Sequence, residues 1–311
     1  MLPALAVHAD WSVSPGKRWM SVAARSAAGW RVSCRPVGSV AGLLERLSAE
    51  ANGGGVALGI DAALGVPIAY ARQLETRAVD FPGFLAGLAA DDALFEVCAT
   101  IEDVSLARPF YPRGVQDRPR RLAHAARLGI GDPDALLRRC DRQTADRPRA
   151  APLFWTLGAN QVGKAALALW RELVLPALAS SAQPLLWPFA GSLAELVRPG
   201  AVVIAETYPA QALRQLDLPL VGSKRRQAGR AALGPHLSAR LAGLRGMPDP
   251  ALADAIAAGF GADAAGEDRF DSLIGLLGLL HVLADPARDT VPKADPALRW
   301  EGWILGQQFQ S

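Results

Sequence analysis

Short apolar runs alternate with turn-forming residues over the first sixty positions of the chain. Three of these runs have the length of a strand, and they lie at 5–9, 19–24 and 30–35. Gly29 separates the last two runs, which predicts a hairpin. Apolar residues at helical spacing predict a helix over 40–51, and a continuous apolar run predicts a buried strand in parallel pairing over 56–60.

The predicted order of these elements is three strands, a helix and a fourth strand. The first three strands form an antiparallel meander, and the helix then crosses back to a parallel strand, a connection that is almost always right-handed. This order opens the RNase H-like fold, and other α/β folds rarely begin in this way. We therefore predict an α/β fold with an RNase H-like mixed sheet, antiparallel in its first three strands, parallel afterwards and flanked by helices. A second buried apolar run over 201–205 adds a further parallel strand.

The pattern is less regular between positions 62 and 200. Helical spacing recurs at 67–73, 84–90, 133–140 and 163–179. An apolar run predicts a strand over 95–101, and a stretch rich in Pro, Arg and Gly predicts a loop over 109–119. Because no linker isolates this region, we predict a single domain over 1–311, with 62–200 as a large, mainly helical insertion that elaborates the core. Further helices are predicted at 209–216, 233–244, 250–259 and 272–283.

Acidic residues follow the apolar runs that predict central strands, and they are Asp10, Asp61 and Glu206. The carboxyl ends of parallel strands form the ligand crevice of an open α/β sheet, so we expect these side chains to converge. Clustered carboxylates repel one another unless a cation offsets their charge, and hard oxygen ligands suit Mg²⁺ or Mn²⁺. The alternative role for each residue is a turn former or a helix N-cap. This alternative is weakest for Glu206, because Glu is a poor turn former.

Two further acids, Asp268 and Asp271, lie three positions apart at the start of the last predicted helix, so they share one helix face. A helix N-terminus favours negative charge. We predict that Asp268 is the N-cap and that Asp271 is the inward-facing ligand. The predicted catalytic residues are Asp10, Asp61, Glu206 and Asp271, and the predicted metal ligands are these four with Asp268. Two metal ions held by such acids activate a water and stabilise the leaving oxygen in phosphodiester cleavage.

Eight longer motifs are spread along the chain. They are HADWS at 8–12, GIDAALGVP at 59–67, RRCDRQT at 138–144, PLFWTLGANQVGK at 152–164, AETYPA at 205–210, SKRRQAGR at 223–230, GEDRFDSLIGLLGLL at 266–280 and EGWILGQ at 301–307. Together they resemble domain-of-unknown-function family 429, a family of predicted RNase H-like nucleases, over essentially the whole chain. The resemblance implies the RNase H-like fold and metal-binding acids at Asp10, Asp61, Glu206 and Asp271. It establishes no substrate.

The most basic segment of the chain, 222–230, follows the Glu206 strand. Lys224, Arg225 and Arg226 are candidates for contacts with a phosphate backbone, and the alternative is a solvated loop. The net charge is only +3, with 33 basic and 30 acidic residues, so contact with nucleic acid must come from such a local patch. DNA and RNA are not distinguished. A non-catalytic nucleic-acid-binding module is the alternative to a metal-dependent nuclease.

A second candidate for phosphate binding is the segment 158–164, which fits the G-x-x-x-x-G-K pattern of a phosphate-cradling loop. The pattern makes Lys164 a candidate substrate-binding residue. It expects Ser or Thr at the next position, whereas this chain has Ala165, which has no hydroxyl for Mg²⁺. The segment also lies in the middle of the chain and not after a first strand. Nucleotide hydrolysis is therefore the third and least favoured function.

Composition excludes several other classes of protein. The chain is 50% hydrophobic and 20% charged, so it can bury a core and is not a disordered chain. Cys34, Cys98 and Cys140 are few, odd in number and far apart, which excludes a disulfide scaffold, and the lack of a CxxC pair argues against a thiolate zinc site. No apolar stretch reaches the ~20 residues of a membrane span, and the first residues lack the features of a signal peptide. We therefore predict a cytoplasmic protein without a membrane partner, whose oligomeric state is left open.

Overall fold

The computed structural model describes residues 1–111, 118–144, 147–156, 162–180, 183–218, 222–292 and 295–308. The chain divides into two compact units. The sheet unit comprises Met1–Asp61, Ala182–Val291 and Ile304–Phe309, and the helical unit comprises Ala62–Ser181 and Pro292–Trp303. Of the predicted insertion, 62–200, the part up to residue 181 belongs to the helical unit and the remainder belongs to the sheet unit.

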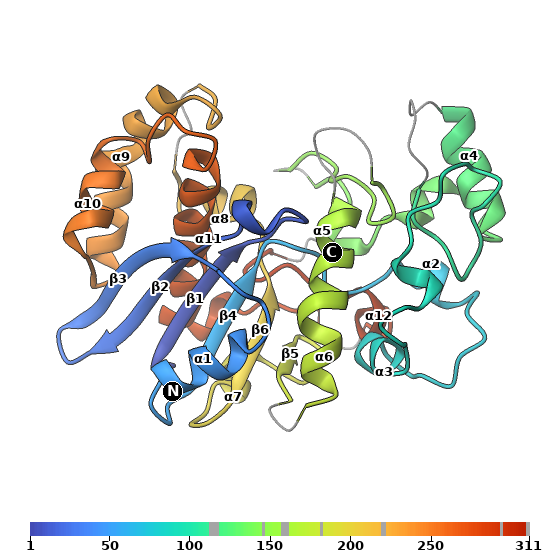
Figure 1. Ribbon diagram of the computed structural model, residues 1–311, viewed down its shortest axis with the longest axis horizontal. Helices are drawn as coiled ribbons and strands as arrows, with labels where there is room; N and C mark the ends of the chain where they lie inside the picture. The colour runs from blue at the N-terminus through green and yellow to red at the C-terminus, as the bar shows by residue number, and fades with distance from the viewer. Residues whose placement is uncertain are drawn as a thin grey trace. The chain divides into compact units, whose positions relative to one another are not determined.

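The described part of the sheet unit contains one mixed sheet of seven strands (Figure 1). They are β1 (Leu5–Asp10), β2 (Trp19–Ser26), β3 (Gly29–Pro36), β4 (Val56–Ile60), β5 (Leu185–Trp187), β6 (Val202–Glu206) and β7 (Gly246–Pro248). Their spatial order is β5-β6-β4-β1-β2-β3-β7. β2 runs antiparallel to β1 and β3, and every other neighbouring pair is parallel. The predicted α/β class and the mixed sheet are confirmed.

The two edge strands, β5 and β7, are absent from the predicted elements. Each has three residues, which is too few for a hydrophobic period to show in the sequence. Their neighbours in the sheet, β6 and β3, supply the pairing partners that hold them. Short edge strands leave little unpaired backbone exposed for pairing with another chain.

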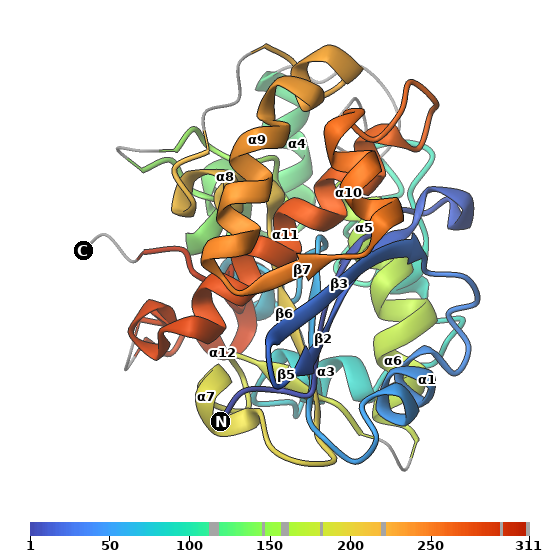
Figure 2. The ribbon, with the colours of Figure 1, turned by 90° about the vertical axis from the view of Figure 1, so that its left-hand side faces the viewer.

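Helices cover both faces of the sheet. The α-helices described in the sheet unit are α1 (Leu43–Glu50), α7 (Leu193–Leu196), α8 (Pro209–Gln215), α9 (Gln227–Gly243), α10 (Pro250–Ala257) and α11 (Gly266–Ala284), and the 3₁₀ turns are η1 (Pro15–Lys17) and η6 (Pro286–Arg288). α11 packs on β1 and β2 with α8 beside it, and α1 lies on the opposite face (Figures 1 and 2). α11 is buried on nearly all sides, as its apolar sequence requires.

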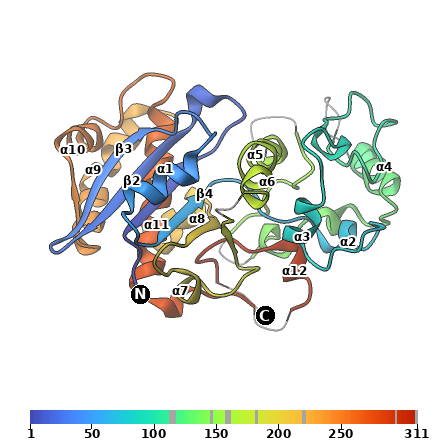
Figure 3. The same ribbon diagram turned by 60° about the horizontal axis from the view of Figure 1, so that its bottom comes forward.

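The described residues of the helical unit form helices and turns. Its helices are α2 (Ile68–Ala71), α3 (Phe81–Ala86), α4 (Arg118–Arg127), α5 (Val162–Leu169), α6 (Leu175–Leu178) and α12 (Leu298–Glu301). The π-helical turn η5 (Trp170–Val174) joins α5 to α6, and the 3₁₀ turns are η2 (Ala93–Phe95), η3 (Pro133–Leu136) and η4 (Arg139–Asp141). α12 lies against α2 and α3 (Figure 3). None of the helices in the described part of the chain combines the length and the apolar character of a membrane span.

The structure differs from the elements predicted by the apolar pattern in parts of the helical unit. The predicted strand over 95–101 is wrong, because the Asp92 side chain accepts from Leu94 N–H and starts η2. The Asp103 carboxylate also accepts from Thr100 N–H at 3.1 Å and turns the chain again. The predicted helix over 133–140 is replaced by η3 and η4, and α4 begins inside the predicted loop over 109–119.

A buried glutamate links the motifs at 138–144 and 301–307 within the helical unit. Glu301 accepts from Ile68 N–H at 2.9 Å and from Arg139 N–H at 2.8 Å, through its two carboxylate oxygens. Arg138, also buried, donates to the Glu301 carbonyl at 3.3 Å and pairs with Asp141 at 2.8 Å. These hydrogen bonds join the motif at 138–144 to Glu301 and stabilise the helical unit.

α11 is held against the sheet by a close contact between a glycine and a histidine. His8 is fully buried on β1, and its Nδ1–H donates to the Ser272 carbonyl of α11 at 3.1 Å. A Cβ atom on Gly275 would lie only 2.1 Å from His8 Nε2. Because a real Cβ atom does not approach another heavy atom so closely, glycine at position 275 allows the helix to reach the strand.

We predict that Gly275→Ala destabilises the protein by about 1 to 3 kcal/mol, the range for overpacking a buried contact. The free energy of unfolding from urea titration is the measurement. Gly243→Ala is the control, because Gly243 is also a helical glycine of the sheet unit, at the end of α9, and a Cβ there would meet no atom within 4 Å. The control should change stability by less than about 1 kcal/mol. Equal effects of the two substitutions would contradict the packing described here.

Candidate functional site

The ends of β1, β4 and β6 bring polar residues to one edge of the sheet. Asp10 is the last residue of β1, and Asp61 directly follows β4. The backbone ladder continues past the strand ends, since Asp61 N–H donates to the Ala9 carbonyl at 3.1 Å and Thr207 N–H donates to the Ile60 carbonyl at 3.0 Å. Asp10, Asp61 and Thr207 are therefore adjacent positions across three parallel strands.

The pairing register decides which face of the sheet each side chain occupies. His8 pairs with Gly59, and Ile60 pairs with Glu206. In-register neighbours share a face and successive residues alternate between faces. Asp10 and Asp61 thus lie on the His8 face, which α11 covers, and alternation places Glu206 on the opposite face.

Thr207 shares the face of Asp10 and Asp61. A Cβ atom on Gly59 would lie 2.8 Å from Thr207 Cγ2, which places the Thr207 side chain over β4 on the α11 side. Sequence reasoning overlooked this residue and selected Glu206 beside it. The signal that the sequence does offer is the alternation of side chains along a strand. This alternation places Glu206, the last residue of β6, and Thr207, the next residue, on opposite faces of the sheet.

α11 brings Asp271 to the same edge. Asp271 lies four residues before Gly275, so both are on the helix face that touches His8. His8 and Asp10 in turn share one face of β1. The contact between Gly275 and His8 therefore aligns Asp271 with Asp10, and the Asp271 side chain is buried.

The prediction that Asp268 is the N-cap of this helix is wrong. α11 begins at Gly266 and its N-cap is Ala265, so Asp268 lies inside the first turn. The earlier start comes from Asp263, whose side chain accepts from Ala265 N–H at 3.0 Å and whose carbonyl accepts from Gly266 N–H at 3.1 Å. Asp268 and Asp271 are both near the helix N-terminus, where the helix dipole favours negative charge.

A cation–π contact orders the turn that follows Asp10. The Arg18 guanidinium lies 4.5 Å from the centre of the Trp11 ring, and both side chains are buried. Arg18 also donates to the carbonyl of Val13 at 3.3 Å. This turn holds the backbone on the C-terminal side of Asp10 in place.

Burial and mutual repulsion raise the pKa values of the acids at this edge. Burial raises the pKa of Asp10 well above its ordinary value, and the carboxylates of Asp61 and Asp271 raise it further. Burial raises the pKa of Asp61 to about 7, with contributions from Asp271 and Glu206. Burial likewise raises the pKa of Asp271 to about 6, against the lowering effect of Lys224. The pKa of Asp268 is also raised by burial.

Lys224 is the cation in contact with this acid cluster, which we define as Asp10, Asp61 and Asp271. Its ammonium group donates to Asp271 Oδ2 and lies 3.5 Å from Glu267 Oε1. Burial acts to lower the pKa of Lys224, but Asp271 and Asp61 raise it above its ordinary value. The ion pair therefore favours the charged form of both partners.

Several oxygen atoms beside the acid cluster have no hydrogen-bond donor. Asp271 Oδ1, Asp268 Oδ2 and Thr207 Oγ1 are buried and unpartnered among the described residues. Buried oxygen ligands without donors fit a hard divalent cation such as Mg²⁺ or Mn²⁺. Across the described residues, however, no three His, Cys, Asp or Glu side chains are arranged to hold a metal ion.

The other residues predicted to bind substrate are divided between the two units. Arg225 and Arg226 are exposed in the turn before α9, next to Lys224. Lys164 is on α5 in the helical unit, whereas the acid cluster belongs to the sheet unit. Of the predicted phosphate-cradling loop, 158–161 lie outside the described residues.

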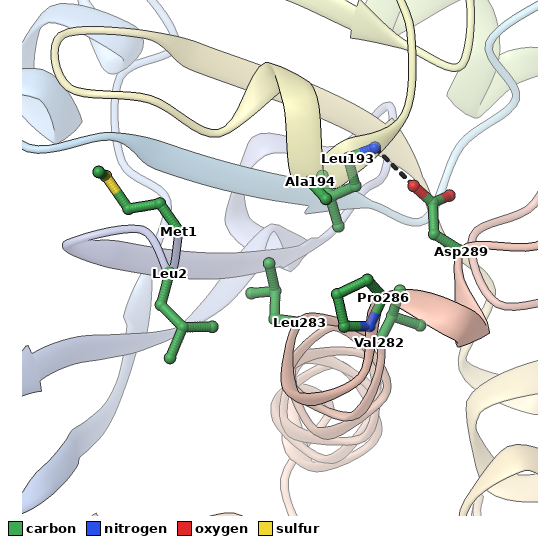
Figure 4. A pocket seen from close by; sticks show the side chains of 8 residues that line it. All are labelled: Met1, Leu2, Leu193, Ala194, Val282, Leu283, Pro286 and Asp289. Atoms are coloured by element: carbon green, nitrogen blue, oxygen red, sulfur yellow. Dashed lines mark hydrogen bonds between the residues drawn. The ribbon is translucent and has the colours of Figure 1, made fainter.

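A separate apolar pocket of about 230 Å³ lies at the far end of α11 from Asp271 (Figure 4). Met1, Leu2 and Leu283 are among its lining residues, together with Asp289. Both carboxylate oxygens of Asp289 already accept hydrogen bonds, from Trp187 Nε1–H at 2.9 Å and from Leu193 N–H at 2.6 Å. This carboxylate therefore has a structural role, and the pocket does not extend the acid cluster.

We predict that protonation of Asp61 stabilises the metal-free protein increasingly as the pH falls from 8 to about 6.5. The folded-state pKa of Asp61, about 7, exceeds the ordinary value of 3.8, so folding takes up a proton at this residue in this range. Burial lowers the pKa of His8 to about 3 and that of His124 to about 4, so both histidines oppose this gain as the pH approaches their ordinary pKa. Urea titrations in EDTA should show the gain as a difference between the wild type and a variant without the Asp61 carboxyl, on the order of 1 kcal/mol.

The matched variant for this test is Asp61→Asn, which removes the titrating group and one repelling charge. It should be more stable than the wild type at pH 8 and should lose most of the pH-dependent gain. An Asp61→Asn protein that is less stable at pH 8, with the pH dependence intact, would show that Asp61 is a structural turn residue.

Comparison with models of known protein families, with curated proteins and with solved structures found no match to this chain. Function is therefore inferred from the geometry of the chain's own residues. The acid cluster, with its unpartnered oxygens and its lysine, is the strongest concentration of reactive groups at the strand ends of the sheet unit.

Proposed function

We propose that this chain is a metal-dependent nuclease of the RNase H-like fold that hydrolyses phosphodiester bonds in nucleic acid. The strand order supports the fold assignment, because β3, β2, β1, β4 and β6 are consecutive in the sheet and only β2 among them is antiparallel. The resemblance of its motifs to domain-of-unknown-function family 429 agrees with this assignment.

One observation carries the proposal. Asp10, Asp61 and Asp271 come from two adjacent parallel strands and from the helix that covers them, and burial and mutual repulsion raise their pKa values. A protein core does not gain stability by placing carboxylates in this way, because each raised pKa destabilises the folded, ionised state. Such an arrangement is typical of a site built for function.

The residues fit a divalent cation, and we propose Mg²⁺ or Mn²⁺. Asp10, Asp61 and Asp271 would hold it, with Asp268 and Thr207 supplying further oxygens. A bound ion of this kind supplies Lewis-acid activation of water and offsets the charge of a phosphodiester. The protein's own residues place the carboxylates at the sheet edge and limit the access of water to them.

Nucleic acid is the proposed substrate. The net charge of +3 gives no general attraction for polyanions, so the exposed Arg225 and Arg226 beside Lys224 are the proposed contacts with the phosphate backbone. Contacts of this kind position the backbone and do not read sequence. The proposal therefore covers DNA and RNA alike.

A non-catalytic nucleic-acid-binding module is the competing function. The observation in its favour is that no three potential ligands among the described side chains are arranged for a metal, while Lys224 contacts Asp271. A binding module predicts salt-sensitive binding of oligonucleotides that EDTA does not change. Cleavage that EDTA stops distinguishes the nuclease from it.

We predict that Asp10→Asn lowers Mg²⁺- or Mn²⁺-dependent cleavage by at least about 100-fold, because it removes a ligand charge without changing the side-chain volume. The measurement is cleavage of a panel of single-stranded and duplex DNA and RNA oligonucleotides. Asp254→Asn is the control, since Asp254 is exposed on α10. Full activity of a folded Asp10→Asn protein would refute the assignment.

We further predict that Glu206→Gln has a smaller effect on cleavage than Asp61→Asn. The two residues are neighbours across β4 and β6, but alternation places Glu206 on the face away from Asp271. Rates for the two variants, measured with the same oligonucleotide at saturating Mn²⁺, should differ by more than about tenfold. A loss as large in Glu206→Gln as in Asp61→Asn would show that Glu206 is a ligand.

A further inference from the structure

The motif SKRRQAGR at 223–230 forms a closed turn at the start of α9. Arg230 is 2% exposed, and its guanidinium donates to the Lys224 carbonyl at 2.6 Å. Gly229 allows the turn to close, because a Cβ atom there would lie 2.6 Å from the Ser223 carbonyl oxygen. The backbone of Lys224 is therefore held by a buried side chain only six residues further along the chain.

The same arginine connects this turn to the segment that precedes α11. Arg230 also donates to the carbonyls of Gly259 at 2.9 Å and Gly261 at 2.6 Å. Arg269 of α11 donates to the intervening Phe260 carbonyl at 2.6 Å. Three consecutive carbonyls are thus bonded alternately from α9 and α11, which ties the backbone of Lys224 to the helix that bears Asp271.

The tip of the Lys224 side chain lies between two carboxylates of α11. Its ammonium group bonds Asp271 Oδ2, while Asp271 Oδ1 remains buried without a donor. Glu267 lies 3.5 Å away on the first turn of α11. A divalent cation bound by Asp271 through the same oxygen could not coexist with the ammonium group at hydrogen-bond distance, because like charges repel strongly at such separations.

We propose that Lys224 is the chain's own counterion for the acid cluster, that it gives up Asp271 Oδ2 when a divalent cation binds, and that Arg230 is the residue that positions it. This inference rests on the proposed metal site. It gives the site two states, one with Lys224 bound to Asp271 and one with a divalent cation in its place. In this structure Lys224 engages Asp271 Oδ2, whereas Asp271 Oδ1 has no donor. Cation binding then becomes an exchange of one positive group for another.

The first test is Mn²⁺ binding by isothermal titration calorimetry, with no nucleic acid present. Lys224→Met should bind Mn²⁺ at least about tenfold more tightly than the wild type, because the competing charge is gone. Arg225→Met is the matched control, since it removes the same charge from the exposed neighbouring residue, and it should change the affinity less than about threefold. Unchanged affinity in Lys224→Met, with circular dichroism showing a folded protein, would overturn the proposal.

The second test asks whether Arg230 acts through Lys224. Arg230→Lys keeps the charge but cannot bridge three carbonyls, so its Mn²⁺ affinity should shift towards that of Lys224→Met. In the double variant the two effects should not add, because Arg230 has no role once the lysine is absent. Additive effects would show that Arg230 is a structural residue without influence on Lys224.

The third test observes the exchange itself. The chain has only four lysines, Lys17, Lys164, Lys224 and Lys293, so ¹⁵Nζ-lysine NMR spectra are simple to assign with single variants. Titration with Mg²⁺ should shift the Lys224 signal more than the Lys164 signal. A Lys224 signal that stays unchanged while calorimetry shows Mg²⁺ binding would contradict the exchange.

These outcomes separate the inference from the proposed nuclease function. If Lys224→Met binds Mn²⁺ more tightly but the wild type cleaves no oligonucleotide, the counterion role stands and the nuclease proposal fails. If the wild type cleaves and Lys224→Met has unchanged Mn²⁺ affinity, the nuclease proposal stands and the counterion role fails.

Discussion

Repulsion among the carboxylates of the acid cluster is the constraint on which the sheet unit depends. Adjacent strand ends bring Asp10 beside Asp61, and the contact between Gly275 and His8 sets α11 at the depth that adds Asp271. The folded chain tolerates this arrangement because Lys224 offsets part of the charge and because raised pKa values allow partial protonation. The packing of α11 on the sheet thus brings the carboxylates together at the strand ends and raises their pKa values.

The sequence pattern predicts the long strands well and the short elements poorly. β1 to β4 and β6 each have at least five residues between turn formers, so their hydrophobic period is visible. β5 and β7 exist because neighbouring strands supply partners, which is a property of the sheet and not of three residues. In the helical unit, side-chain caps such as Asp92 decide the backbone where the apolar run predicts a strand.

The candidate site shows the same division between local and long-range information. The hydrophobic pattern alone places Asp10 and Asp61 at the ends of strands and Asp271 near the start of a helix. The face taken by Glu206 depends on its register with Ile60, and a shift of one residue would exchange it with Thr207. The position of Lys224 depends on Arg230, which also bonds Gly259 and Gly261, some thirty residues away in the chain, and no local sequence pattern contains such bonds.

The place at which the helical unit leaves the sheet unit has an evolutionary consequence. Residues 62–181 depart one peptide bond after Asp61, yet Asp10, Asp61, Lys224 and Asp271 all belong to the sheet unit. The helical unit is thereby joined to the sheet unit directly after Asp61, and it supplies none of the three residues of the acid cluster. Changes in the length or the surface of the helical unit can therefore accumulate without replacing any of these carboxylates.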